Sequence, residues 1–163
     1  MRRILVAILA LLVVLAGAGA VWIRTVSHEP VERWHVDPLT VPDPATQNFH
    51  RVGPAGLSPS PAHAAAPVYR AEPSELARAF DDMAMRQPDT LRLAGSPEEG
   101  WMTYVQRTRI MKFPDYISVK VIGLGEGRST LAIFSRSRFG TRDMGVNEAR
   151  VKSWLQALKP LEE

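Results

Sequence analysis

The feature that most constrains this chain is an uninterrupted apolar run close to its first residue. Residues 4–23 read ILVAILALLVVLAGAGAVWI, 20 positions without a charged side chain. At about 1.5 Å per residue, a helix of this length reaches about 30 Å, the thickness of a bilayer's apolar core. The run has no polar face of the kind that a helix at the surface of a soluble domain needs. It therefore predicts a transmembrane helix.

Charged residues on either side of the run predict its orientation. Arg2 and Arg3 precede it, and only Arg24 follows closely. Because positive charge is retained in the cytoplasm, residues 1–3 form a cytoplasmic tip and the rest of the chain lies outside. We expect a single-pass protein of the inner (cytoplasmic) membrane whose domain faces the periplasm or exterior. The alternative is a signal sequence cleaved after the small residues 18–20, which exports the same domain.

The cysteine and histidine content excludes several kinds of chemistry. The chain has no cysteine, so it has no disulfide, thiolate metal site or cysteine nucleophile. Its four histidines all lie at or before residue 63, so no Ser–His pair is available in the C-terminal part. We therefore expect that the chain is not an enzyme and that it binds no metal or cofactor. The net charge of +3 is small and is not gathered in runs, and we expect no nucleic-acid partner.

Proline marks the next part of the chain as a connector. Residues 24–70 hold 8 of the 13 prolines, and proline disfavours long helices. Trp34 and Phe49 are too apolar for a fully solvated tether. We expect residues 31–53 to lie partly against the domain as an extended strap.

Regular periodicity begins at residue 71 and predicts one small domain over 71–163. Apolar residues at helical spacing predict helices over 73–86 and 145–158. Alternation of apolar and polar residues predicts four strands, over 90–94, 101–111, 116–124 and 130–138. Short connections favour antiparallel pairing with both helices on one face. The predicted fold class is α+β: a helix, a four-stranded antiparallel sheet and a C-terminal helix, after an N-terminal transmembrane helix.

A dense polar motif follows the last predicted strand. Residues 135–150 read SRSRFGTRDMGVNEAR, and Phe-Pro-Asp stands upstream at 113–115. This pattern resembles the family called domain of unknown function 1499, and the resemblance covers residues 71–160. The matching positions are Arg136, Ser137, Arg138, Gly140, Asp143, Gly145, Asn147 and Arg150. The resemblance implies the same fold and an envelope or membrane context, and it implies no activity. Many members carry a cysteine-containing segment that this chain lacks.

The arginines in and near the motif suggest an anion site. Guanidinium groups bind phosphate and carboxylate through two donors at once, and a helix N-terminus adds oriented amides. The candidate residues are Arg136, Arg138, Arg142, Arg150, Arg107 and Arg109.

A structural role for the same motif is the alternative. Asp143 would then accept hydrogen bonds from Arg138 or Arg150 and cap the helix, and Asn147 would fix the turn. The glycines would serve backbone geometry. The residues with this possible role are Ser137, Gly140, Asp143, Gly145, Asn147 and Asp115.

These observations predict a non-catalytic, membrane-anchored envelope domain that binds an anionic ligand or lipid head group. The alternative is a protein-interaction or scaffolding module in which the Arg/Asp motif is purely structural. The expected partners are the lipid bilayer, through residues 4–23, and an anionic lipid, a glycan or an envelope protein.

Overall fold

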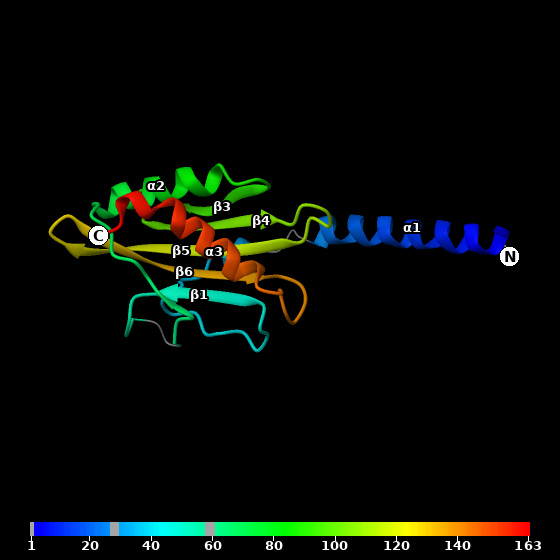
Figure 1. Cartoon of the computed structure of the whole chain (residues 1–163), viewed down its shortest axis with the longest axis horizontal. Coiled ribbons are helices and arrows are strands. Elements are labelled where there is room, and N and C mark those ends of the chain that lie inside the picture. Colours follow the sequence, from blue (N-terminus) through cyan, green and yellow to red (C-terminus); the bar gives the residue numbers. More distant parts are fainter. Residues whose placement is uncertain (1, 27–29, 58–60) are drawn as a thin grey trace.

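The computed structural model describes residues 2–26, 30–57 and 61–163. A six-stranded sheet has the order β2-β1-β6-β5-β4-β3 (Figure 1). Neighbouring strands are antiparallel except β1 and β2, which pair in parallel. The strands are β1 (Phe49–Gly53), β2 (Ala64–Ala65), β3 (Thr90–Ser96), β4 (Trp101–Arg107), β5 (Pro114–Gly125) and β6 (Arg128–Ser137).

Two helices pack on one face of this sheet. The α-helices are α1 (Arg2–Val26), α2 (Pro73–Met85) and α3 (Val146–Ala157), with short 3-10 turns at Val31–Arg33 and Lys159–Leu161. Between α2, α3 and the sheet, Trp154 contacts Phe80 and Tyr104 with ring centroids 5.8 and 6.0 Å away. The aliphatic side chains of alternate positions in β4, β5 and β6 complete this core. Both helices therefore cover the same face of the sheet, an arrangement that the short connections favour.

The opposite face is covered by residues 31–43, which we call the covering segment. Trp34 stacks on Tyr116 with ring centroids 3.8 Å apart. The Trp101 indole N–H donates to the carbonyl of Val36 at 3.3 Å. The fully buried Arg51 of β1 donates to the carbonyl of Val41 at 2.8 Å. The sheet is thus enclosed by helices on one side and by an irregular segment on the other.

The predicted four-stranded antiparallel sheet is wrong, because two further strands join it and one pair is parallel. Residues 49–53 pair with β6, placing Arg51 opposite Phe134. Residues 64–65 then pair in parallel with the end of β1. Their short lengths and proline-rich surroundings leave no long alternating pattern, so only long-range pairing identifies them.

The predicted membrane span is also corrected. Over the residues that the structure describes, no helix combines the length and the apolar character that crossing a membrane requires. A spanning helix needs about 20 consecutive apolar residues. The expectations of a transmembrane helix over residues 4–23 and of a single-pass inner-membrane protein are therefore not supported.

Candidate functional site

A buried polar network lies where β5 and β6 meet the N-terminus of α3. Arg150 is its centre, and its guanidinium forms an ion pair with Asp115, with side-chain exposures of 7% and 4%. Arg150 also donates through Nε to Gln106 Oε1 and through Nη1 to Asn147 Oδ1, each at 2.6 Å. A buried guanidinium is costly unless its charge and its donors are all matched. Here a carboxylate and neutral acceptors match them.

Asn147 links this ion pair to three other parts of the chain. Its Nδ2 donates to Asp143 Oδ2 at 2.7 Å, to Ser137 Oγ at 3.0 Å and to the carbonyl of Asn48 at 3.1 Å. Its Oδ1 accepts from Ser135 Oγ at 2.6 Å. The side chain is fully buried, so these bonds replace its hydration. We call the set the motif network: Asn48, Gln106, Asp115, Ser135, Ser137, Asp143, Asn147 and Arg150.

Asp143 occupies the N-terminus of α3. Its carboxylate accepts from the backbone N–H of Gly145 at 3.1 Å and of Asn147 at 2.8 Å. Burial opposes ionisation of Asp143, but the hydrogen bonds from Asn147 and Gly145 outweigh it and lower the pKa of the carboxyl. The helix amides expected to face a ligand are therefore engaged by the chain's own carboxylate.

The two motif glycines allow tight turns on either side of Asp143. Gly140 and Gly145 have φ of 84° and 81°, in the left-handed region that favours glycine. The Gly140 carbonyl accepts from Asn48 Nδ2 at 2.7 Å, which holds the loop against β1. Met144 lies between the glycines with φ of 54°, so its exposed side chain is held on a left-handed residue.

Strand alternation divides the predicted arginine cluster between the two faces of the sheet. Ser135 and Ser137 face α3, so Arg136 and Arg138 face the covering segment. Arg136 lies over the ring of Trp34 at 4.6 Å and donates to the carbonyl of Arg33 at 2.7 Å. Burial and the positive charge of Arg33 lower the pKa of Arg136. Arg136 and Arg138 therefore do not share a site with Arg150.

Four of the six predicted arginines line two adjoining hollows at this end of the sheet. A hollow of about 580 Å³ is lined by Arg107, Arg109 and Arg150. A neighbouring hollow of about 440 Å³ is lined by Arg142 and shares Thr108 with the first. The strand predicted over 101–111 ends at Arg107, so Arg109 lies in a turn rather than on the strand.

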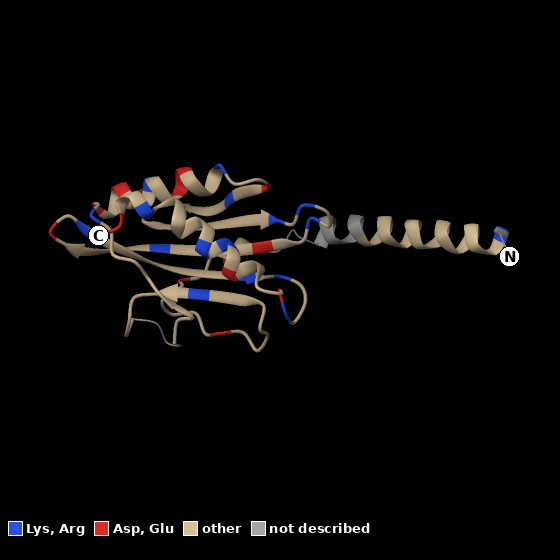
Figure 2. Ribbon diagram, viewed as in Figure 1, with Lys and Arg blue, Asp and Glu red and all other residues tan. Residues whose placement is uncertain are grey.

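Two loops, 108–113 and 139–145, which we call the tip loops, form part of the walls of these hollows, and members of the motif network such as Arg150 and Asp115 form another part. Both loops lie at the end of the sheet opposite the β5–β6 hairpin (Figure 1). Basic residues mark both loops in Figure 2. The tip loops therefore bring the end of β4 and the motif together.

Positive charge is in excess at the tip loops. Asp115 pairs with Arg150, and Asp89 pairs with Lys112 at 2.7 Å. Among residues 2–26, 30–57 and 61–163, Arg107, Arg109 and Arg142 form no ion pair, and Arg107 donates only to the Lys112 carbonyl, at 3.3 Å. Arg109 and Arg142 are exposed to solvent. Within the described part of the chain, these three guanidinium groups at the tip therefore have no carboxylate partner.

Sequence reasoning missed three members of the network: Asn48, Gln106 and Ser135. Asn48 lies in the predicted connector, 99 residues before Asn147, so no local pattern reveals the contact. Gln106 immediately precedes Arg107, the first arginine of the predicted pair Arg107 and Arg109. Because side chains alternate along a strand, Gln106 lies on the same face of β4 as Tyr104, and this alternation predicts that it faces α3.

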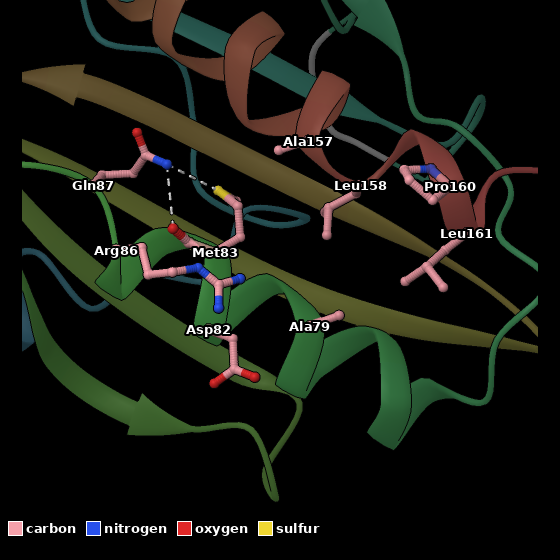
Figure 3. Close-up of a pocket in the computed structure, with 9 residues that line it drawn as sticks. All are labelled: Ala79, Asp82, Met83, Arg86, Gln87, Ala157, Leu158, Pro160 and Leu161. Carbon is pink, nitrogen blue, oxygen red and sulfur yellow. Dashed lines mark hydrogen bonds between the residues drawn. The ribbon is translucent and has the colours of Figure 1, made fainter.

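A further hollow, of about 390 Å³, lies between the end of α2 and the end of α3 (Figure 3). Asp82 and Arg86 line it and are both exposed. The Gln87 side-chain amide is engaged with Met83, at 3.3 Å from its carbonyl and 3.7 Å from its sulfur. The polar groups that line this hollow do not converge on one point, so the hollow is a weaker candidate for a binding site than the tip loops.

Acidic and histidine side chains do not cluster in the part of the chain that the structure describes. No group of three or more His, Cys, Asp or Glu side chains is placed there to hold a metal ion. The residues around the tip hollows are basic, apolar and hydroxyl-bearing, apart from the engaged carboxylates. This end of the sheet is therefore suited to an anion.

Comparison with protein families gives a match over most of the chain. Residues 32–158 match the family model described as "Protein of unknown function (DUF1499)". No curated protein and no solved structure matches the chain. The match starts well before residue 71, so it takes in the covering segment and β1 as well as the motif network. Because it extends over more than half of the chain, this protein belongs to the DUF1499 family.

Proposed function

We propose that this chain is a non-catalytic domain that binds an anionic ligand at the tip loops. One observation carries the proposal: Arg107, Arg109 and Arg142 border two joined hollows and form no ion pair among the described residues. Guanidinium groups without an internal carboxylate can give both donors to phosphate or carboxylate oxygens.

The motif network is the frame of this site rather than its binding surface. The guanidinium of Arg150 forms an ion pair with Asp115 and a hydrogen bond with Asn147, so these groups bind one another rather than a ligand. Asp143 closes the N-terminus of α3. Because the polar groups of the motif network are hydrogen-bonded to one another, they hold the adjoining loops in one conformation. Less conformational entropy is then lost when a ligand binds.

The state of the carboxylates supports a binding role over a catalytic one. A general base needs a carboxylate or imidazole that is free to accept a proton from the substrate. Asp115 is held by Arg150, and Asp143 is held by two backbone amides with a lowered pKa. Among the described residues, no histidine lines either tip hollow.

Thermal unfolding in the presence of inorganic phosphate tests the proposal. A ligand at about 100 times its Kd adds about 2.7 kcal/mol, which raises the Tm by several degrees. We expect this rise in the native chain and its loss in the double variant Arg109→Gln, Arg142→Gln. Arg128→Gln, at the opposite end of the sheet, is the matched control and keeps the rise.

The alternative is a scaffolding module whose Arg/Asp motif is purely structural. The saturation of the motif network is the observation that favours it. It predicts no change in Tm with phosphate, or the same change in the native chain and the double variant. Either result would reject the anion site at the tip loops.

A further inference from the structure

The tip loops expose apolar side chains among their arginines. Ile110 is 86% exposed, and Met144 is 100% exposed. Met111 and Val146 beside them are also exposed. Large apolar side chains that are exposed on loops, rather than buried in the core, are typical of surfaces that bind another molecule or a membrane.

The fold holds these apolar groups outward. Met144 has a positive φ, which costs free energy for a residue that is not glycine. Asp143, just before Met144, accepts hydrogen bonds from the backbone N–H groups of Gly145 and Asn147, just after it. In the other tip loop, 108–113, the backbone N–H of Lys112 donates to the Thr108 carbonyl at 3.1 Å and closes the turn. Both apolar side chains therefore stand on loops that are fastened at their bases.

Cations flank the apolar groups in both loops. Arg109 precedes Ile110, and Arg142 lies two positions before Met144. Their guanidinium groups are exposed and form no ion pair among the described residues. A surface of this kind combines attraction to negative charge with an apolar group that gains by leaving water.

We infer that the tip loops dock on an anionic lipid surface, with Arg109 and Arg142 on head-group phosphates and Ile110 and Met144 in the apolar layer below. This inference rests on the proposed anion site and names the source of its anion. It concerns adsorption of the loops on one lipid leaflet.

A lipid surface fits the tip better than a folded partner does. Protein interfaces need preformed shape complementarity at an apolar core. Met144 is fully exposed and makes no part of a packed patch. The apolar side chains stand on two separate loops bordering the hollows rather than on one flat face. A fluid acyl layer adapts to such projections, and phosphates complement the excess of arginine.

A fluorophore attached at the tip tests the inference in the full chain. The native sequence has no cysteine, so Met144→Cys provides one labelling site. Leu124→Cys, in the exposed hairpin at the other end of the sheet, is the matched control. The readout has to be local, because α1 is apolar and can adsorb on vesicles by itself. Each labelled chain is mixed with phosphatidylglycerol vesicles and with phosphatidylcholine vesicles.

We expect a shift of emission to shorter wavelength at position 144 with phosphatidylglycerol, and none at position 124. Adding Arg109→Gln and Arg142→Gln to the labelled Met144→Cys chain should weaken vesicle affinity by about fivefold per arginine. Ile110→Ser should also weaken it, while Arg128→Gln should leave it unchanged.

Three results would overturn the inference. They are no shift at position 144, equal shifts at positions 144 and 124, or equal shifts with both lipids. Inorganic phosphate separates this failure from that of the proposed function. If phosphate still raises the Tm through Arg109 and Arg142, the anion site stands and its ligand is soluble or belongs to a protein. If phosphate also has no effect, both proposals fail.

Discussion

The two faces of the sheet hold buried arginines in different ways. On the helix face, Arg150 is matched by the carboxylate of Asp115 and by neutral side-chain acceptors. On the other face, Arg51 lies over the ring of Phe134 at 4.5 Å, donates to two backbone carbonyls and forms an ion pair with Asp43 at 2.9 Å. Arg136 lies over Trp34 on that same face.

The difference follows from what each face packs against. α3 brings side chains of fixed spacing, so Asn147 and Arg150 reach the sheet three residues apart on one helix face. The covering segment has only short hydrogen-bonded turns, at Val31–Arg33 and at Asp37, so the carbonyls of Pro38 and Val41 accept from Arg51. The partners of Arg150 are all side chains, whereas the covering segment gives Arg51 backbone carbonyls in addition to the Asp43 carboxylate.

Removing the carboxylate on the helix face should have the largest effect. Asp115→Ala leaves Arg150 buried without a counter-charge, and we expect the free energy of unfolding to fall by about 3–5 kcal/mol. Urea unfolding followed by circular dichroism measures it. The paired variant Asp115→Leu, Arg150→Met removes both charges and should recover most of the loss. A cost below about 1 kcal/mol for Asp115→Ala would mean that the ion pair does not hold the network.

The cap of α3 comes next. Asp143→Ala removes the acceptor for two backbone amides and the Asn147 side chain, at an expected cost of about 1–3 kcal/mol. The folded pKa of Asp143 lies below its ordinary value of 3.8, so its contribution is complete above that pH. It is lost as the pH falls through the lower, folded value. Unfolding at neutral and acidic pH should therefore show the native chain and the variant converging in acid. Asp82→Ala, at an exposed position of α2, is the control for loss of a carboxylate and should cost no more than about 0.5 kcal/mol at neutral pH.

The cation over Trp34 should matter less than the ion pair. Arg136→Gln removes a guanidinium from the ring, and we expect unfolding to become easier by about 0.5–2 kcal/mol. Arg136→Lys keeps the charge and should lose less. If Arg136→Gln cost as much as Asp115→Ala in the same urea assay, the contrast between the two faces would be wrong.

The exposed tip arginines should affect stability least of all. Arg109→Gln and Arg142→Gln break no ion pair among the described residues, so each should change unfolding by no more than about 0.5 kcal/mol. The same variants should lose the rise in Tm with phosphate. Large destabilisation would instead assign these arginines to the frame and not to the binding surface.

Much of the regular structure could be predicted from periodicity. α2 lies within the predicted 73–86, and α3 lies within 145–158. The four strands from β3 to β6 overlap their predicted ranges. These elements are long enough for their apolar residues to show a recognisable helical or strand period. β1, with five residues, and β2, with two, are too short to show one.

The candidate site was only partly predictable. In the structure, Asp143 lies at the start of α3 and accepts from its backbone amides, and Gly140 and Gly145 have positive φ. The joint anion site of six arginines does not form, because alternation along β6 sends Arg136 and Arg138 away from Arg150. That separation follows from the two-residue period of a strand, once both sides of the sheet are known to be covered.

Local spacing alone determined which residues form α2, α3 and the central strands, and which face of its own element each side chain takes. Only the tertiary structure decided what each face meets. The bond from Asn147 to Asn48 joins residues 99 apart, and the ion pair from Arg150 to Asp115 joins residues 35 apart. Periodicity acts over a few residues, whereas the partner of a buried charge is whichever group folding brings within hydrogen-bond distance.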